Sequence, residues 1–177
     1  MCGILVTCGG RQTFHHRLLN GLRRRGPDSI GFWSDDRVHL AHTRLAIVGL
    51  DDRGIEPLEN DTHVLAYNGE IYNFLELSRR LAAEGVDVGY ANDAWVLLHA
   101  WSRWGEKVLA DMTGFWAFAI YEKATRKLTL VRDQLGIKPL YYWKTQDGIA
   151  VSSLLGSLVG AVGQTPELDY RAMSESR

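Results

Sequence analysis

Four short β-prone segments follow one another closely in the second half of the chain. Turn-forming residues separate them, and the segments are Phe115–Glu122, Lys127–Asp133, Pro139–Lys144 and Gly148–Ser152. Strands with connections this short pair in an antiparallel manner, because a parallel pair needs a crossover of about a dozen or more residues. This pattern therefore restricts the chain to folds that contain antiparallel sheet.

The first half of the chain combines further strand-like segments with helical patterns. Strands are predicted at Gly3–Cys8, at His63–Asn68 and, as one or two strands, at Val38–Val48. A polar loop is predicted between them, over Asp51–Asp61. The strands of this half are thus farther apart along the chain than those of the second half.

Apolar residues recur at helical spacing in four segments. These are Phe14–Leu22, Asn73–Leu81, Asn92–Trp104 and Leu154–Val162. Asn73 is expected to cap the second helix, and Asn92 or Asp93 the third. Helices clustered between groups of strands indicate an α+β fold in which stacked antiparallel sheets are covered by helices.

Length and composition place the chain among ordinary globular domains. It has 177 residues, of which 46% are hydrophobic and 23% charged, with a net charge of −1. This balance lacks the basic surface expected of a protein that binds nucleic acid or an anionic membrane. Since no stretch approaches the roughly 20 apolar residues of a membrane span, and no secretory signal is apparent, we expect a soluble, cytoplasmic protein.

Cys2 is the residue whose position carries the clearest chemical meaning. If Met1 is removed, the thiol and a free α-amine belong to the same residue, so that one residue supplies both a nucleophile and a base. Taken alone, a cysteine at this position is more often a small buried thiol. The only other cysteine, Cys8, lies roughly 20 Å away along one strand, and both thiols are therefore predicted to be free.

A series of motifs gives Cys2 its context. They are Met-Cys-Gly-Ile at 1–4, Arg-Gly-Pro-Asp at 25–28, His-Thr-Arg-Leu-Ala-Ile-Val at 42–48, Tyr-Asn-Gly-Glu-Ile-Tyr-Asn at 67–73, Asn-Asp at 92–93, Gly-Phe-Trp-Ala-Phe-Ala-Ile-Tyr at 114–121 and Arg-Asp-Gln-Leu-Gly-Ile-Lys-Pro-Leu-Tyr-Tyr at 132–142. In this order and spacing the chain resembles the N-terminal glutaminase domain of asparagine synthetases and related class II amidotransferases. The resemblance runs from Met1 to about Leu158 and implies a four-layer αββα sandwich of the N-terminal nucleophile hydrolase type.

The resemblance also assigns catalytic roles. It implies that Cys2 attacks the carboxamide of glutamine, and that the Asn68 side chain and the Gly69 N–H form the oxyanion hole. Gly69 is expected to permit a close approach and an unusual backbone angle. Without the resemblance, Asn68-Gly69 would first be interpreted as a turn.

Substrate-binding roles follow from the same resemblance. Arg44 would bind the α-carboxylate of glutamine, and Asp93 with Glu70 its α-ammonium. Ile47 and Val48 are likewise expected among the substrate-binding residues. Taken alone, Arg44 could be a surface ion-pair residue and Asp93 a helix N-cap.

Two further segments are assigned supporting roles. Arg25–Asp28 is expected to brace the strand that carries the nucleophile, and not to act directly in catalysis. The segment from Arg132 to Pro139 is a strand and turn that, by the resemblance, lies towards a partner synthetase domain.

The predicted function is hydrolysis of L-glutamine to glutamate and ammonia in a domain spanning 1–162, with 163–177 as a polar tail or linker stub. The ammonia would supply an ATP-dependent, asparagine synthetase-like partner. No metal-ligand spacing, Walker loop or dinucleotide fingerprint occurs, so the chain is expected to need no metal or cofactor, with ATP and Mg²⁺ only on the partner. Two alternatives stay open: a catalytically idle scaffold or regulatory domain of a synthetase, and an N-terminal nucleophile hydrolase for another amide.

Overall fold

Two antiparallel sheets form the centre of the protein in a computed structural model, which describes residues 1–9, 19, 21–46, 54–89, 92–144 and 146–162. The first sheet has the order β2-β3-β1-β9-β8 and the second the order β4-β5-β6-β7. The strands of the first sheet are β1 (Gly3–Gly9), β2 (Ser29–Ser34), β3 (Val38–Arg44), β8 (Tyr141–Lys144) and β9 (Gly148–Ser152). Those of the second are β4 (Leu58–Glu59), β5 (His63–Ile71), β6 (Gly114–Glu122) and β7 (Lys127–Arg132).

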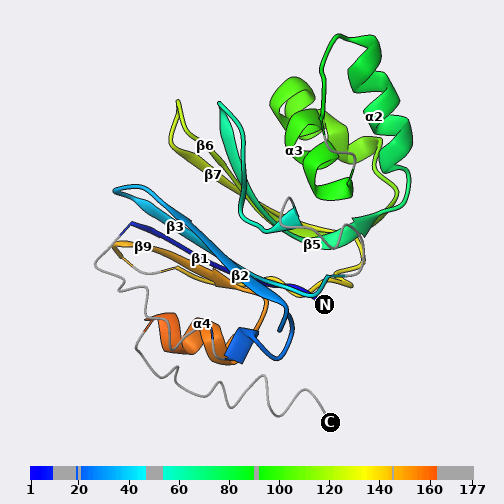
Figure 1. The fold of residues 1–177 in the computed structure, drawn as a ribbon. Helices are drawn as coiled ribbons and strands as arrows, with labels where there is room; N and C mark the ends of the chain where they lie inside the picture. The colour runs from blue at the N-terminus through cyan, green and yellow to red at the C-terminus, as the bar shows by residue number, and fades with distance from the viewer. Residues whose placement is uncertain (10–18, 20, 47–53, 90–91, 145, 163–177) are drawn as a thin grey trace.

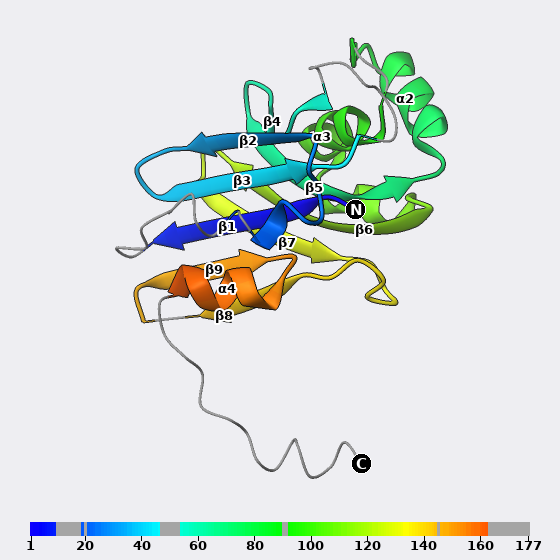
Figure 2. The ribbon, with the colours of Figure 1, turned by 60° about the horizontal axis from the view of Figure 1, so that its bottom comes forward.

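Helices cover the outer face of each sheet (Figure 1). The second sheet is covered by α2 (Phe74–Ala83) and α3 (Asp93–Trp104), the latter continuing into the short 3-10 helix η2 (Gly105–Ala110). The first sheet is covered by α4 (Leu155–Val162), which lies over β8 and β9 (Figure 2). The order of layers is therefore helix, sheet, sheet, helix.

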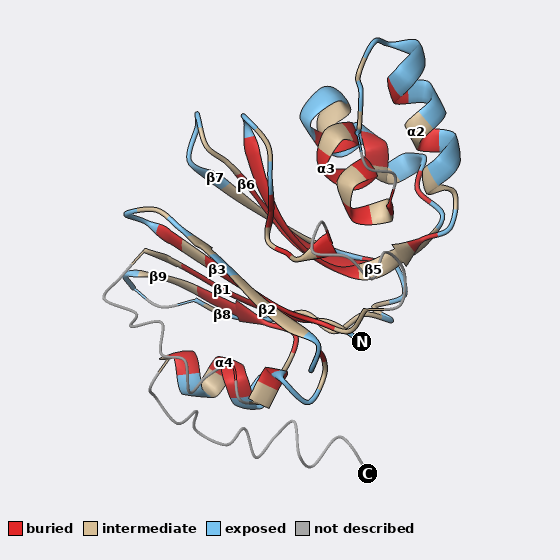
Figure 3. Ribbon diagram, viewed as in Figure 1, coloured by how far each residue is buried: buried red, intermediate tan, exposed pale blue. Residues whose placement is uncertain are grey.

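Three separate groups of buried apolar residues fill the three spaces between these four layers. Leu65 and Phe118 belong to the group under α2 and α3, Ile4 and Val64 to the group between the sheets, and Leu5 to the group under α4. Neighbouring residues of one strand thus enter different groups, because successive side chains point to opposite faces. Buried residues form nearly continuous stretches along the central strands β1, β3, β5 and β6 (Figure 3). The predicted four-layer α+β sandwich is confirmed.

Several predicted boundaries agree with the structure and others need correction. The loop predicted at Asp51–Asp61 contains the two-residue strand β4, and β2 was not anticipated. β2 is half exposed, because it is an edge strand that pairs only with β3. It therefore lacks the run of buried apolar residues that marks a central strand. Most of the helix predicted at Phe14–Leu22, and the whole tail 163–177, lie outside the described residues.

Both cysteines are free, as predicted. Within the described part of the chain, no helix is long and apolar enough to span a lipid bilayer.

Candidate active site

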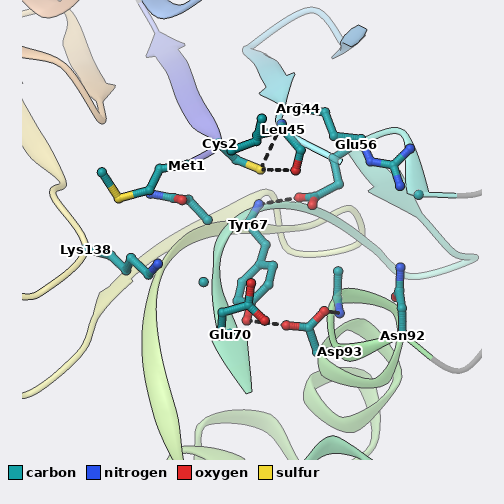
Figure 4. A pocket seen from close by; sticks show the side chains of 14 residues that line it. Met1, Cys2, Arg44, Leu45, Glu56, Tyr67, Glu70, Asn92, Asp93 and Lys138 are labelled. Atoms are coloured by element: carbon teal, nitrogen blue, oxygen red, sulfur yellow. Dashed lines mark hydrogen bonds between the residues drawn. The ribbon is translucent and has the colours of Figure 1, made fainter. Parts of the chain in front are cut away.

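One pocket gathers six of the eight predicted site residues: Cys2, Arg44, Asn68, Gly69, Glu70 and Asp93. It lies where the start of β1, the end of β3, the second half of β5 and the first turn of α3 meet (Figure 4). The remaining two, Ile47 and Val48, lie outside the described residues. Segments separated by up to about half of the chain's length are thus brought to one place by strand pairing.

Cys2 lies just before β1, beside the residue that follows β3. The Leu45 N–H donates to Sγ at 3.5 Å, and the thiol faces the Leu45 carbonyl at 3.8 Å. Arg25 Nε donates to the Cys2 carbonyl at 3.0 Å, which agrees with the predicted bracing role of the Arg25–Asp28 segment. Burial, with the nearby Glu56 carboxyl, raises the pKa of the Cys2 thiol to about 11. A base is therefore needed to ionise it at neutral pH.

Asn68 lines this pocket and carries an unpaired donor. Like the even-numbered residues Val64 and Ala66 of β5, Asn68 directs its side chain into the space between the two sheets. The side chain of Ile4, two residues after Cys2, lies in the same space. Only 2% of the residue is exposed, and Nδ2 has no hydrogen-bond partner. An unsatisfied buried donor costs about 1–3 kcal/mol, and such a group in a native structure calls for an explanation.

Gly69 contributes a second donor, from the main chain. In β5 the N–H groups of odd-numbered residues point away from β6, as shown by Tyr67 N–H, which donates to Glu56, and Ile71 N–H, which donates to Asp93. The Gly69 N–H lies between them on the same open edge. The edge that β4 leaves uncovered is thus the wall of the pocket.

The reason for a glycine at position 69 differs from the prediction. Its φ is not in the left-handed region, so no unusual backbone angle is involved. A Cβ there would approach Tyr67 Cε2 to 2.6 Å and the Phe115 carbonyl oxygen to 2.7 Å. Glycine is required because the Tyr67 ring lies across that position.

Asp93 is available to a ligand because its neighbour performs the capping. Asn92 is the N-cap of α3 and accepts from the Trp95 N–H at 2.8 Å, so of the two predicted capping residues it is Asn92 that acts. Asp93 instead accepts from the Tyr67 hydroxyl at 2.8 Å and from the Ile71 N–H at 3.2 Å. Burial raises the pKa of Asp93, and burial together with Asp93 raises that of Glu70. A cation bound between them would stabilise both carboxylates.

Arg44 lies at the opposite part of the pocket wall, at the end of β3. It is 8% exposed, and a Cβ on Gly54 would contact its guanidinium group. The pocket therefore has a buried guanidinium contributed by one sheet and two carboxyl groups contributed by β5 and α3. This separation of charge suits a zwitterion of amino-acid size.

The glutamine amidotransferase domain is the family whose model matches this chain, over residues 1–176. The chain belongs to the glutamine amidotransferase family. This confirms the predicted membership of class II and the predicted enzyme class.

Curated relatives agree with this assignment. Asparagine synthetase [glutamine-hydrolyzing] 3 of Bacillus subtilis is 35% identical over 159 residues, 88% of this chain and 25% of that protein. Asparagine synthetase B of Escherichia coli is 39% identical over 141 residues, 78% of this chain and 25% of that protein. The chain thus spans about a quarter of the length of these relatives.

The fold of this amidotransferase domain is also found in a longer enzyme. Glutamine phosphoribosylpyrophosphate amidotransferase of B. subtilis superposes with a TM-score of 0.77 at 21% identity, over 93% of this chain and 44% of that one. At this identity the likeness concerns the fold alone, and it confirms the N-terminal nucleophile hydrolase architecture.

Of the residues that line the pocket of the amidotransferase domain without having been predicted from the sequence, three carry ionisable side chains: Glu56, Tyr67 and Lys138. Tyr67 immediately precedes the Asn-Gly pair, and its hydroxyl holds Asp93. Lys138 belongs to the segment expected to face a partner domain, yet it lines the pocket and lowers the pKa of Glu70 against the effect of burial. Its loop is held by the Asp133 carboxylate, which accepts from the N–H groups of 135, 137 and 138.

Metal ligation has no basis in the described residues, where no group of three or more His, Cys, Asp or Glu side chains could hold an ion. The expectation that the chain needs no cofactor stays a prediction.

Proposed function

We propose that this domain hydrolyses L-glutamine to glutamate and ammonia, with Cys2 as the nucleophile after removal of Met1. The observation that carries the proposal is that Asn68, whose buried Nδ2 has no hydrogen-bond partner, lines the same pocket as Cys2 and Gly69. Two donors beside a nucleophile are what a tetrahedral oxyanion requires.

The raised pKa of the thiol sets the course of the first step. In the chain that carries Met1 the buried thiol is un-ionised at neutral pH, so after removal of Met1 we expect the thiol to lose its proton as it attacks the carboxamide carbon. The α-amine of Cys2, free once Met1 is removed, accepts that proton and passes it to the departing nitrogen, directly or through a water. Ammonia leaves, a glutamyl thioester remains, and water then hydrolyses the thioester to glutamate.

Charge in the pocket favours an α-amino acid over a simple amide. Arg44 would hold the α-carboxylate in a bidentate manner, and Asp93 with Glu70 the α-ammonium. An amide lacking either group would leave a buried charge unpaired, which is the strongest basis for discrimination. This is the argument against a hydrolase for a different amide.

We further propose that the ammonia is delivered to an ATP-dependent, asparagine synthetase-like partner, on which ATP and Mg²⁺ would be bound. Support comes from the relatives, which are glutamine-hydrolysing asparagine synthetases about four times as long as the matching segment. The partner could be a further domain or a separate subunit.

The test combines intact-mass measurement with a glutaminase assay. Protein whose first residue is Cys2 should release glutamate from glutamine, Cys2→Ala should abolish the release, and Cys8→Ser should leave it unchanged as the control for a second free thiol. Residual activity in Cys2→Ala would reject the nucleophile.

Absence of activity in correctly processed wild type, alone and with a synthetase partner, would favour the idle scaffold. The hydrolase for another amide would be favoured if glutaramate, which lacks the α-amine, competed as well as glutamine.

A further inference from the structure

Glu56 is a buried acid in the wall of the active-site pocket, and the catalytic scheme gives it no task. Only 7% of the residue is exposed. Its Oε2 accepts from the Tyr67 N–H at 2.5 Å, and its Oε1 lies 3.7 Å from His42 Nε2. Figure 4 shows its carboxyl group between the Leu45 and Cys2 side of the pocket and the Tyr67 main chain.

Glu56 is significant because its carboxyl group lies against the open edge of β5. The N–H groups of three alternate residues of β5 point out of this edge, those of Tyr67, Gly69 and Ile71. The first donates to Glu56 and the last to Asp93, so carboxyl groups flank the Gly69 N–H on both sides. Asp93 lies on the side that would hold the substrate ammonium, and Glu56 on the side of the nucleophile.

His42 completes the attachment of this strand. Its Nε2 lies 2.9 Å from the Tyr67 carbonyl oxygen, which makes Nε2 the protonated nitrogen, and its Nδ1 has no partner. Beyond the point where β4 pairs with β5, side chains therefore bind both main-chain polar groups of Tyr67: Glu56 binds its N–H and His42 binds its carbonyl oxygen. Because Tyr67 directly precedes Asn68 and Gly69, these two side chains fix the position of the oxyanion donors.

The protonation state of Glu56 matters because negative charge develops beside it. An ionised Glu56 disfavours the thiolate, as its effect on the Cys2 pKa shows. Burial raises the pKa of Glu56 well above its usual range, the neighbouring Asp93 adds to this, and the Tyr67 N–H and Arg44 oppose it. His42 supplies no compensating charge, since burial lowers its pKa to about 4.

The remaining charged side chains that line the pocket are those of Glu70 and Lys138. Lys138 lowers the pKa of Glu70 against burial, and the Tyr67 phenol stays neutral because burial raises its pKa. Arg44 is thus the cation that lowers the pKa of Glu56, and a bound substrate carboxylate would pair with Arg44.

We propose that Glu56 is a positioning residue that works in its protonated form, holding the Tyr67 main chain so that Asn68 and Gly69 face the reacting carbonyl, and that its ionisation switches the glutaminase off. The inference rests on the proposed function. Asn68 and Gly69 act on the oxyanion directly. Glu56 acts indirectly, because it holds these two donors in place and because, when protonated, it places no negative charge beside the reacting thiol.

The test compares Glu56→Gln and Glu56→Ala with wild type over a pH series. Glutamine in place of Glu56 keeps an oxygen for the Tyr67 N–H and cannot ionise, so the alkaline fall of kcat, which approaches about tenfold per pH unit when one essential proton is lost, should disappear. Alanine should lower kcat about 10- to 100-fold at every pH, because the donors are displaced. Glu59→Gln, at an exposed position of β4 paired with Lys123, should retain the wild-type profile.

A second readout does not depend on turnover. In a Cys8→Ser background, the rate at which iodoacetamide alkylates Cys2 at alkaline pH should rise in Glu56→Gln, because removal of the negative neighbour lowers the thiol pKa. An alkaline fall of kcat that persists in Glu56→Gln, or an unchanged alkylation rate, would overturn the inference. If wild type lacked glutaminase activity while the alkylation rate responded as expected, the proposed function would fail and the charge effect of Glu56 would stand.

Discussion

Replacing Asn68 by alanine should separate activity from stability. The side chain is almost fully buried, yet its Nδ2 has no partner in the free enzyme. If this donor is reserved for the oxyanion, its removal should lower kcat about 10²- to 10³-fold, equivalent to roughly 2.7–4 kcal/mol of transition-state stabilisation.

The effect on folding should be much smaller. Alanine removes an unsatisfied buried donor, which regains about 1–3 kcal/mol, and loses packing of comparable size. The net change should stay within about 1 kcal/mol, or less than about 4 °C in Tm for a domain of this size. If the role of Asn68 were structural, the alanine variant would instead lose stability and keep its kcat.

The assay is steady-state glutaminase kinetics beside thermal unfolding, with Asn60→Ala as the matched control. Asn60 Oδ1 accepts from the N–H groups of Thr62 at 3.0 Å and His63 at 2.8 Å, in a turn away from the pocket. That variant should lose about 1 kcal/mol of stability and keep its kcat. A kcat of Asn68→Ala within about threefold of wild type, or a loss of activity explained by unfolding, would refute the oxyanion assignment.

Three further outcomes are expected. Gly69→Ala should lose about 1–3 kcal/mol of stability by thermal unfolding, because its Cβ meets the Tyr67 ring, whereas Gly156→Ala, with open space around it, should be neutral or stabilising; equal effects would contradict this reasoning. Arg44→Lys should raise the KM for glutamine about 10- to 100-fold with little change in kcat, and a change confined to kcat would argue against a ground-state carboxylate contact. Burial raises the pKa of Asp133, but hydrogen bonds from four main-chain N–H groups outweigh burial, so that the net pKa is lowered. The ionised Asp133 therefore stabilises the folded protein fully above the ordinary Asp pKa near 4, and this stabilisation is lost as pH falls through the depressed value. Unfolding of Asp133→Asn should therefore differ from wild type at pH 7 and converge with it in acid, and a pH-independent difference would exclude the charge effect.

Much of the fold was accessible from the sequence because local patterns report burial. The closely spaced strands of the second half, and the alternation that sends Ile4 and Leu5 to different layers, follow from side-chain periodicity alone. β2 and β4 were missed because an edge strand and a two-residue strand carry little periodicity. Their pairing is decided by the neighbouring strand.

The sequence by itself determined the family, the α+β architecture and six of the residues in the pocket, since motif and periodicity are properties of the chain as written. Tertiary structure alone decided that Glu56 and Lys138 join them, and that Asn92 caps α3 so that Asp93 faces the pocket. It also decided why residue 69 is a glycine, a matter of the Tyr67 ring and not of a backbone angle. The physical reason is that hydrogen-bond partners, desolvation and the resulting pKa changes depend on groups distant in sequence, which only strand pairing and layer packing bring together.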